Sequence, residues 1–153
     1  MGREVRRVPA DWEHPRYTAD DVITSQRDRI GSYRPLHDRS YRDACEAWYH
    51  EASAFTPDQS IRPCLFYHEY AGPPPDADDK THRDREWTEA EATHYQMYET
   101  VTEGTPVSPV FATKAELIDY LVTHGDYSDQ RRIFGDPPRG GWTRQAAERF
   151  VTS

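Results

Sequence analysis

Cysteine is scarce in this 153-residue chain, in which Cys45 and Cys64 are the only two. Two thiols cannot build the disulfide framework of a small secreted domain, so the sequence favours a reducing compartment. Apolar runs are also short, and none approaches the roughly 20 residues that a membrane-spanning helix needs. Residues 1–7 contain no apolar core for a signal peptide. We therefore expect a cytoplasmic protein that does not associate with a membrane.

Sequence motifs of the common enzyme classes are absent as well. The chain has no Gly-x-Ser-x-Gly nucleophile turn, no Gly-x-x-x-x-Gly-Lys phosphate loop and no Gly-x-Gly-x-x-Gly fingerprint. The pattern Cys64-x-x-x-His68 has metal-ligand residue types, but on a strand these two side chains would lie about 13 Å apart. The sequence therefore favours a non-catalytic protein, and it predicts no catalytic residue, no cofactor and no metal site.

The residues that are present make a polar chain with many aromatic side chains. Hydrophobic residues make up 35% of it and charged residues 30%, and the mean hydropathy is −1.01, so the core must be small. Aromatic residues make up 12%, which argues against a wholly disordered chain because each ring can bury a large area. The length leaves room for one domain.

Negative charge is concentrated in the middle of the chain. Of the formal net charge of −8, residues 1–42 contribute +2, residues 43–104 contribute −10, and residues 105–153 are neutral. Such a chain is a poor candidate for direct DNA binding, since affinity for phosphate comes from cations. The acidic segment is either a solvated face or a nucleic-acid-like surface that binds a protein. The second interpretation would use Asp76, Asp78, Asp79 and Glu86.

The spacing of apolar residues predicts three helices, at residues 41–55, 114–124 and 143–152. The first two begin with capping boxes, Ser40 with Asp43 and Thr113 with Glu116, and the third begins at Thr143. A further box, Thr88 with Glu91, predicts a short helix to about residue 93. The last helix meets no stop signal, so either it frays or the natural chain continues beyond Ser153.

Alternating residues predict strands at 61–70 and 95–102, and two prolines limit residues 107–112 to an extended segment. A helix that continues through Met97 is the alternative for the second strand. The predicted fold class is α+β: a small antiparallel sheet packed by three helices, with long loops. Residues 38–153 would form this single domain, and residues 1–37 an irregular, extended N-terminal arm anchored by Trp12 and Tyr17.

One group of residues could bind an anionic, ring-bearing ligand such as a nucleotide. The turn at residues 103–108 offers backbone N–H groups and hydroxyls, arginines offer forked donors, and aromatic rings offer stacking faces. The residues of this predicted site are Tyr95, Tyr98, Thr105, Ser108, Arg131, Arg132, Trp142 and Arg144. Each also has a structural explanation, in the turn, in surface ion pairs or in the core.

Three blocks of sequence carry a resemblance to a known family. They are residues 2–9 (GREVRRVP) with 12–15 (WEHP), residues 95–111 around YQMYET and EGTPVSPVF, and residues 141–151 (GWTRQAAERFV). Together they resemble a family of small, uncharacterised proteins encoded by bacteriophages and prophages. The resemblance brings no catalytic residues, and it implies an accessory protein in the bacterial host cytoplasm.

Three functions follow as hypotheses. The first is a phage protein that counteracts a host defence by sequestering a small nucleotide-derived signal without catalysis. The alternative is an acidic protein-binding inhibitor, a nucleic-acid mimic, of a host defence complex. The third is an enzyme that acts on a nucleotide or a host protein. Assembly into a homo-oligomer is compatible with each.

Overall fold

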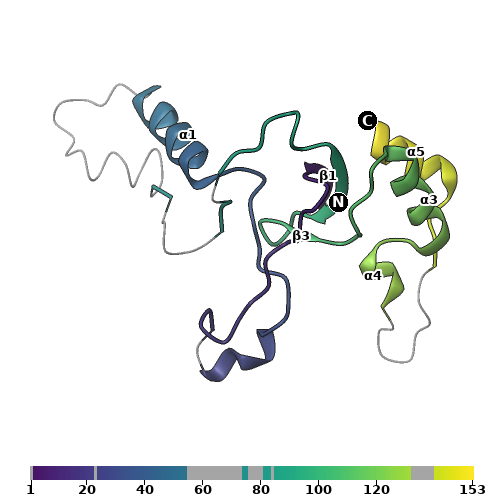
Figure 1. The fold of residues 1–153 in the computed structure, drawn as a ribbon, viewed down its shortest axis with the longest axis horizontal. Helices are drawn as coiled ribbons and strands as arrows, with labels where there is room; N and C mark the ends of the chain where they lie inside the picture. The colour runs from purple at the N-terminus through teal and green to yellow at the C-terminus, as the bar shows by residue number, and fades with distance from the viewer. Residues whose placement is uncertain (1, 23, 55–73, 76–80, 84, 132–139) are drawn as a thin grey trace. The chain divides into compact units, whose positions relative to one another are not determined.

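The computed structural model describes residues 2–22, 24–54, 74–75, 81–83, 85–131 and 140–153 (Figure 1). The chain divides into two compact units, one made of residues 1–35 with 87–153 and the other of residues 36–86. The fold class is confirmed as α+β, with a small antiparallel sheet and the three predicted helices. The predicted division into an extended N-terminal arm (1–37) and a single α+β domain (38–153) stays a prediction.

The sheet has three antiparallel strands in the order β1-β2-β3. They are β1 (Arg3–Val8), β2 (His94–Glu99) and β3 (Thr105–Pro106). The strand predicted at 95–102 is β2, and it ends three residues earlier than expected. The extended segment that follows β3 contributes an isolated bridge between Tyr95 and Phe111. The strand predicted at 61–70 lies outside the described residues.

Strand β1 was not predicted, because the sequence analysis assigned its residues to an irregular arm. It pairs with β2 along its whole length, and Val5 lies opposite Met97. Its six residues include three arginines and one glutamate, so no apolar face stands out in the sequence. An edge strand tolerates such charge because one of its sides meets no other strand.

One face of the sheet is covered by helices α3 (Lys114–His124) and α5 (Arg144–Thr152). Met97 from β2 joins a core with buried residues of both helices. These are Leu117, Ile118, Leu121, Ala147 and Val151. The predicted apolar face of α3 is thereby confirmed.

The helix ends of this unit follow the predicted capping residues. Thr113 and Thr143 accept hydrogen bonds from backbone N–H groups in the first turns of α3 and α5, and Gly125 ends α3 with φ +75°. Glu116 does not complete the predicted box with Thr113, because its carboxylate accepts from the Ala112 N–H instead. The short helix α4 (Tyr127–Gln130) was not predicted, and it begins with a capping box of Asp126 and Asp129. The helix predicted after Thr88 is wrong: the capping box with Glu91 forms, but it closes only a turn before β2 begins.

The opposite face of the sheet is covered by aromatic side chains of the loops. The Trp12 indole donates to the Tyr98 hydroxyl at 2.9 Å and packs edge-on against Trp87. Trp12 therefore anchors its segment as predicted. A 3-10 helix, η1 (Thr24–Arg29), follows in the same segment.

The second unit contains helix α1 (Tyr41–Ala54), which matches the first predicted helix. Ser40 caps it by accepting a hydrogen bond from the Asp43 N–H at 3.1 Å. Asp43 does not complete the predicted box, because the carboxylate of Glu86 accepts from the Ser40 N–H instead. A distant residue thus takes the place that local sequence assigned to Asp43.

Candidate anion-binding pocket

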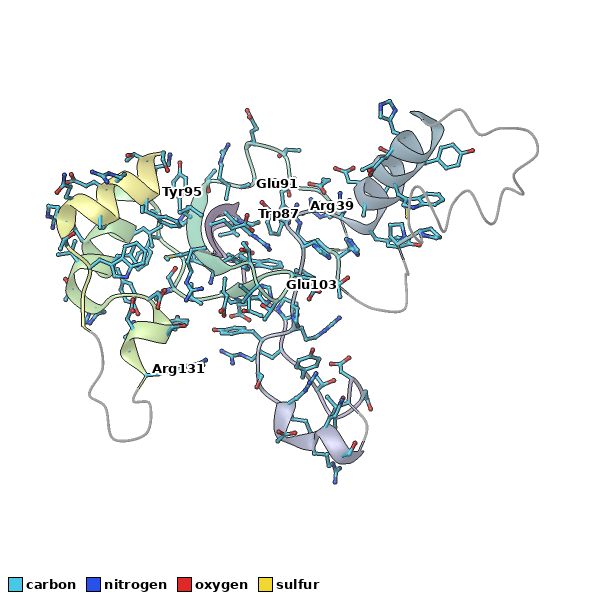
Figure 2. All side chains as sticks on the ribbon, turned by 180° about the vertical axis from the view of Figure 1, so that it is seen from behind. Arg39, Trp87, Glu91, Tyr95, Glu103 and Arg131 are labelled. Carbon is cyan, nitrogen blue, oxygen red and sulfur yellow. The ribbon has the colours of Figure 1, made fainter. Side chains whose placement is uncertain are left out.

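A cavity of about 600 Å³ lies where β1 and β2 meet the ends of α3 and α5. We call it the cationic pocket, because three of its lining side chains are Arg3, Arg7 and Lys114. The other lining residues are Glu4, Val5, Tyr95, Phe150, Val151 and Ser153. Tyr95 lies on the side of β2 that faces the helices (Figure 2).

The strand period places the cations of β1 on the face of this pocket. Side chains alternate along a strand, so Arg3, Val5 and Arg7 share one face. The register sets Arg7 directly opposite Tyr95. The backbone bond from Thr100 to Gly2 shows that odd-numbered residues of β1 sit in the non-hydrogen-bonded pairs, in which side chains lie closer together.

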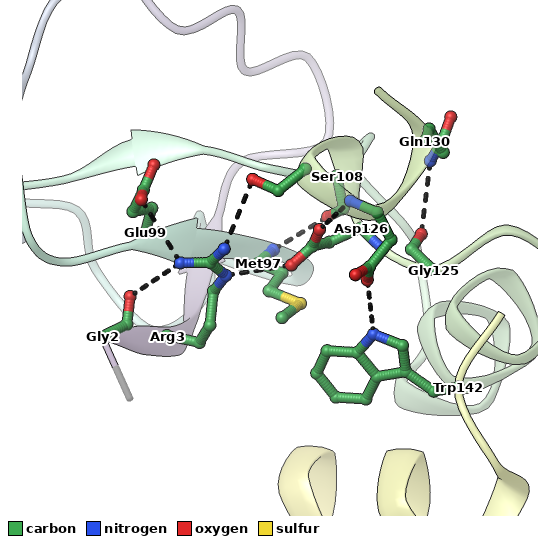
Figure 3. Close-up of polar contacts among 11 residues, drawn as sticks. Gly2, Arg3, Met97, Glu99, Ser108, Gly125, Asp126, Gln130 and Trp142 are labelled. Atoms are coloured by element: carbon green, nitrogen blue, oxygen red, sulfur yellow. Dashed lines mark hydrogen bonds and ion pairs between the residues drawn. The ribbon is translucent and has the colours of Figure 1, made fainter. Parts of the chain in front are cut away.

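Arg3 forms a fixed, charge-balanced wall of the pocket (Figure 3). Its Nε donates to Asp126 at 2.9 Å, and its other nitrogens reach Glu99 at 3.4 Å and Ser128 at 3.3 Å. Asp126 is only 3% exposed and also caps α4. Arg3 therefore joins β1 to α4, and its charge is largely balanced by carboxylates.

Arg7 and Lys114 are different, because within the described ranges neither has a carboxylate partner. Arg7 is exposed and donates only to the backbone oxygen of Glu89, at 3.2 Å. The Lys114 ammonium lies 5.7 Å from the centroid of the Tyr95 ring. Lys114 is the first residue of α3, where the positive end of the helix dipole disfavours a cation and favours an anion.

The one acidic side chain among the described lining residues does not neutralise these cations. Glu4 points to the other face of β1, where its carboxylate accepts from the Arg6 Nε at 2.6 Å. The pocket thus combines two cations without acidic partners and the rings of Tyr95 and Phe150. Such a set can hold an anionic group beside a flat ring.

The structure brings few of the sequence-predicted ligand residues to this pocket. Tyr95 lines it, and Trp142 packs against its lining residue Phe150 with ring centroids 5.6 Å apart. The Trp142 indole donates to Asp129 at 2.7 Å (Figure 3). Arg7 and Lys114 were missed, although the pattern Arg3-x-Val5-x-Arg7 would have placed two cations on one strand face.

The remaining predicted residues lie elsewhere or have partners. Thr105 of β3 bonds to Thr102 at 3.2 Å, and Arg144 pairs with Asp119 at 3.1 Å. Arg131 is exposed at the end of α4, and Arg132 lies outside the described residues.

Ser108 in particular is unavailable to a ligand. It is fully buried, and its hydroxyl accepts from the Met97 N–H and donates to the Pro109 oxygen, each at 2.9 Å. The free hydroxyl that the sequence analysis expected in this turn therefore completes the backbone pairing beside β3.

Tyr98 belongs to a hydrogen-bonded chain on the other face of the sheet. The backbone oxygen of Arg34 can only accept, so the Nε2 of His14, 2.6 Å away, carries the proton. The Nδ1 of neutral His14 then accepts from the Tyr98 hydroxyl at 3.0 Å, and that hydroxyl accepts from Trp12. Burial lowers the pKa of His14 to about 4, against the raising effect of the bond to Arg34.

The candidate acidic surface is mostly undescribed. Asp76, Asp78 and Asp79 lie outside the described residues. Glu86 accepts hydrogen bonds from the Ser40 N–H and from the Arg83 guanidinium, the latter at 3.0 Å. Burial acts to raise the pKa of the Glu86 carboxyl, but these two bonds outweigh it and the pKa is lowered.

A second cavity, of about 340 Å³, lies along α3 and offers less chemistry. Its two carboxylates already have hydrogen-bond or ion-pair partners: Glu116 accepts from the Ala112 N–H at 3.3 Å, and Asp119 pairs with Arg144.

In the described ranges, no group of three or more His, Cys, Asp or Glu side chains could hold a metal ion. The helices of those ranges include none with the length and apolar character of a membrane span.

Comparison with known proteins returned no match: no family model fits the chain, and no curated protein or solved structure is similar to it.

Proposed function

We propose that the protein binds a small anionic, nucleotide-like ligand in the cationic pocket without catalysing its conversion. The observation that carries the proposal is the placement of Arg7 and Lys114, two cations without acidic partners in the described structure, beside the ring of Tyr95. Phosphate would bind the cations, and a base would stack on the ring. The volume of about 600 Å³ falls within the usual range of small-molecule sites.

The biological setting that we propose is the cytoplasm of a bacterial host. There the protein would act as a phage accessory protein that sequesters a nucleotide-derived signal of a host defence. The resemblance of residues 2–9, 95–111 and 141–151 to phage-encoded proteins supports this setting. The lack of catalytic motifs in the sequence supports sequestration rather than conversion of the signal.

A thermal-shift panel tests ligand class. Cyclic dinucleotides, cyclic ADP-ribose and linear nucleoside triphosphates form the panel, and a ligand at 100 times its Kd adds about 2.7 kcal/mol of stability. Adenosine, which lacks phosphate, and pyrophosphate, which lacks a ring, are the matched controls and should shift the Tm less. No shift with any nucleotide contradicts the proposal.

Chromatography of the bound nucleotide separates binding from catalysis. We expect the ligand to be recovered unchanged after incubation with the protein and heat release. A new product would instead support the third hypothesis, an enzyme that acts on a nucleotide.

The alternative function, an acidic inhibitor of a host defence complex, rests on the net charge of −10 in residues 43–104. The Glu86 carboxylate already accepts hydrogen bonds from Arg83 and from the Ser40 N–H, so a charge-reversing substitution of Glu86 would disturb the fold. The informative variant reverses only Asp76, Asp78 and Asp79 to Lys. Loss of inhibition of the defence complex, together with inhibition that weakens as salt rises, would favour this alternative.

A further inference from the structure

The ring of Phe150 packs on a tryptophan whose orientation is set by hydrogen bonds. Phe150 lines the cationic pocket, and its ring centroid lies 5.6 Å from that of Trp142, with the two planes at 73° in an edge-on contact. The Trp142 backbone N–H donates to the Leu121 oxygen at 2.8 Å, and the indole donates to Asp129 at 2.7 Å (Figure 3). The Phe150 ring is therefore supported by a side chain that is held at both ends.

Asp129 connects Trp142 to the capping box of α4. Its Oδ2 accepts from both the Trp142 indole and the Asp126 N–H, the latter at 3.0 Å. Asp126 accepts in return from the Asp129 N–H at 2.9 Å, and its other oxygen accepts from the Arg3 Nε. A continuous series of contacts thus runs from Arg3 on β1, through α4, to Phe150 on α5. Both ends of this series line the cationic pocket.

Tyr95 provides a second ring in the same pocket. It comes from β2, whereas Phe150 comes from α5, and both line the cavity. No ring contact joins these two side chains in the part of the chain that the structure describes, where the ring partner of Phe150 is Trp142. Two aromatic walls that do not close on each other can receive a flat ring between them.

We propose that the base of a bound nucleotide enters the cationic pocket between Tyr95 and Phe150. Trp142 and Asp129 are then positioning residues, which hold the Phe150 ring in place. The inference rests on the proposed function, to which it adds a second ring-binding residue. Preorganisation supports it, because a ring that is already held loses little freedom when a base stacks on it. On this account Trp142, which the sequence predicted as a ligand residue, acts through Phe150.

Pyrophosphate and a nucleotide separate the ring site from the cations. Pyrophosphate has no ring, so it would use Arg7 and Lys114 alone. Phe150→Leu removes the aromatic wall and keeps an apolar side chain. We expect the Kd of the panel nucleotide with the largest Tm shift to rise at least about fivefold, while the Kd of pyrophosphate stays within about twofold. Equal rises in both Kd values, or no rise in either, overturn the inference if the variant keeps the wild-type circular dichroism spectrum.

Substitutions of Asp129 test the positioning role without changing a pocket residue. Asp129→Ala removes the acceptor of the Trp142 indole, so we expect the nucleotide Kd to rise at least about threefold with the Kd of pyrophosphate unchanged. Asp129→Asn should restore the wild-type Kd, because a single amide oxygen can accept both bonds that Oδ2 accepts.

Gln130→Ala is the matched control for these variants. It removes two hydrogen bonds made by a side chain of the same helix, and neither goes to Trp142 or Asp126. We expect its two Kd values to match those of the wild type. A nucleotide Kd that is equal in Asp129→Ala and the wild type, or an Asp129→Asn variant that binds as weakly as Asp129→Ala, contradicts the positioning role.

The two proposals fail in different ways. If a panel nucleotide binds with the same Kd to the wild type, Phe150→Leu and Asp129→Ala, this inference is refuted and the proposed function stands. If no nucleotide binds the wild type, the proposed function is refuted, and this inference with it.

Discussion

Acid should destabilise the fold through His14. The side chain is 6% exposed and neutral, held between the Tyr98 hydroxyl and the Arg34 backbone oxygen. A proton on Nδ1 would place a donor against the Tyr98 hydroxyl and a charge near the Arg6 guanidinium, whose carbon lies 4.2 Å from the Tyr98 ring centroid. Burial disfavours the charged imidazolium most strongly, and the nearby arginines add to this, so the pKa of His14 is lowered from 6.5 to about 4.

The sign and size of the effect follow from the two pKa values. The unfolded chain takes up the proton near pH 6.5 and the folded chain only near pH 4, so the stability from neutral His14 is complete above pH 6.5 and is lost as pH falls. At 1.36 kcal/mol per pKa unit, the loss is about 2 kcal/mol by pH 5 and about 3 kcal/mol below pH 4.

Urea unfolding followed by tryptophan fluorescence at pH 7, 6 and 5 measures this loss. The matched variant is His14→Gln, whose amide can still donate to the Arg34 oxygen but does not titrate. Other groups titrate in both proteins, so the difference between their pH slopes isolates His14. Equal losses of unfolding free energy in the wild type and in His14→Gln would refute the reasoning.

Other predictions concern the same unit. Tyr98→Phe removes the hydroxyl that donates to His14 and accepts from Trp12. We expect the free energy of unfolding in urea to fall by about 1–3 kcal/mol, because these two buried partners are left without a hydrogen bond. Asp126→Ala leaves Arg3 without its closest carboxylate and removes the α4 cap, so the loss should reach about 3–5 kcal/mol, and a loss under 1 kcal/mol would show that the ion pair is dispensable. Burial, with the neighbouring tyrosines, raises the pKa of Tyr127 to about 12, so the absorbance of tyrosinate at 295 nm should show one group titrating well above 10, and Tyr127→Phe should remove it.

The helices could be predicted because their signals are local. Thr113, Gly125 and Thr143 mark helix ends within one turn, and the apolar spacing of α3 identifies the face that is buried. Thr88 shows the limit of such signals. Its capping box with Glu91 forms as predicted, but β2 begins three residues after Glu91, at His94, and pairs with β1.

Strand β1 and the cationic pocket could not be predicted in the same way, because both depend on contacts between residues far apart in the sequence. Arg3 is stabilised by Asp126, more than a hundred residues away, and Arg7 lies beside Tyr95 only because of the register between β1 and β2. Tyr95 was predicted as a ligand residue, and it does line the cationic pocket. The arginines predicted to lie near it were those of the C-terminal part, because nothing local connects Arg7 to Tyr95.

The central claim is that the cations of the cationic pocket bind the phosphate of the ligand. Isothermal titration calorimetry with the nucleotide that gives the largest thermal shift tests this claim most directly. The comparison is between the wild type, the double variant Arg7→Gln, Lys114→Gln, and Arg42→Gln, which removes an exposed cation of α1. We expect the Kd to rise at least about tenfold in the double variant, since a charged hydrogen bond contributes about 1.5–3 kcal/mol, and to stay unchanged in Arg42→Gln. Equal affinity in all three proteins would contradict the account.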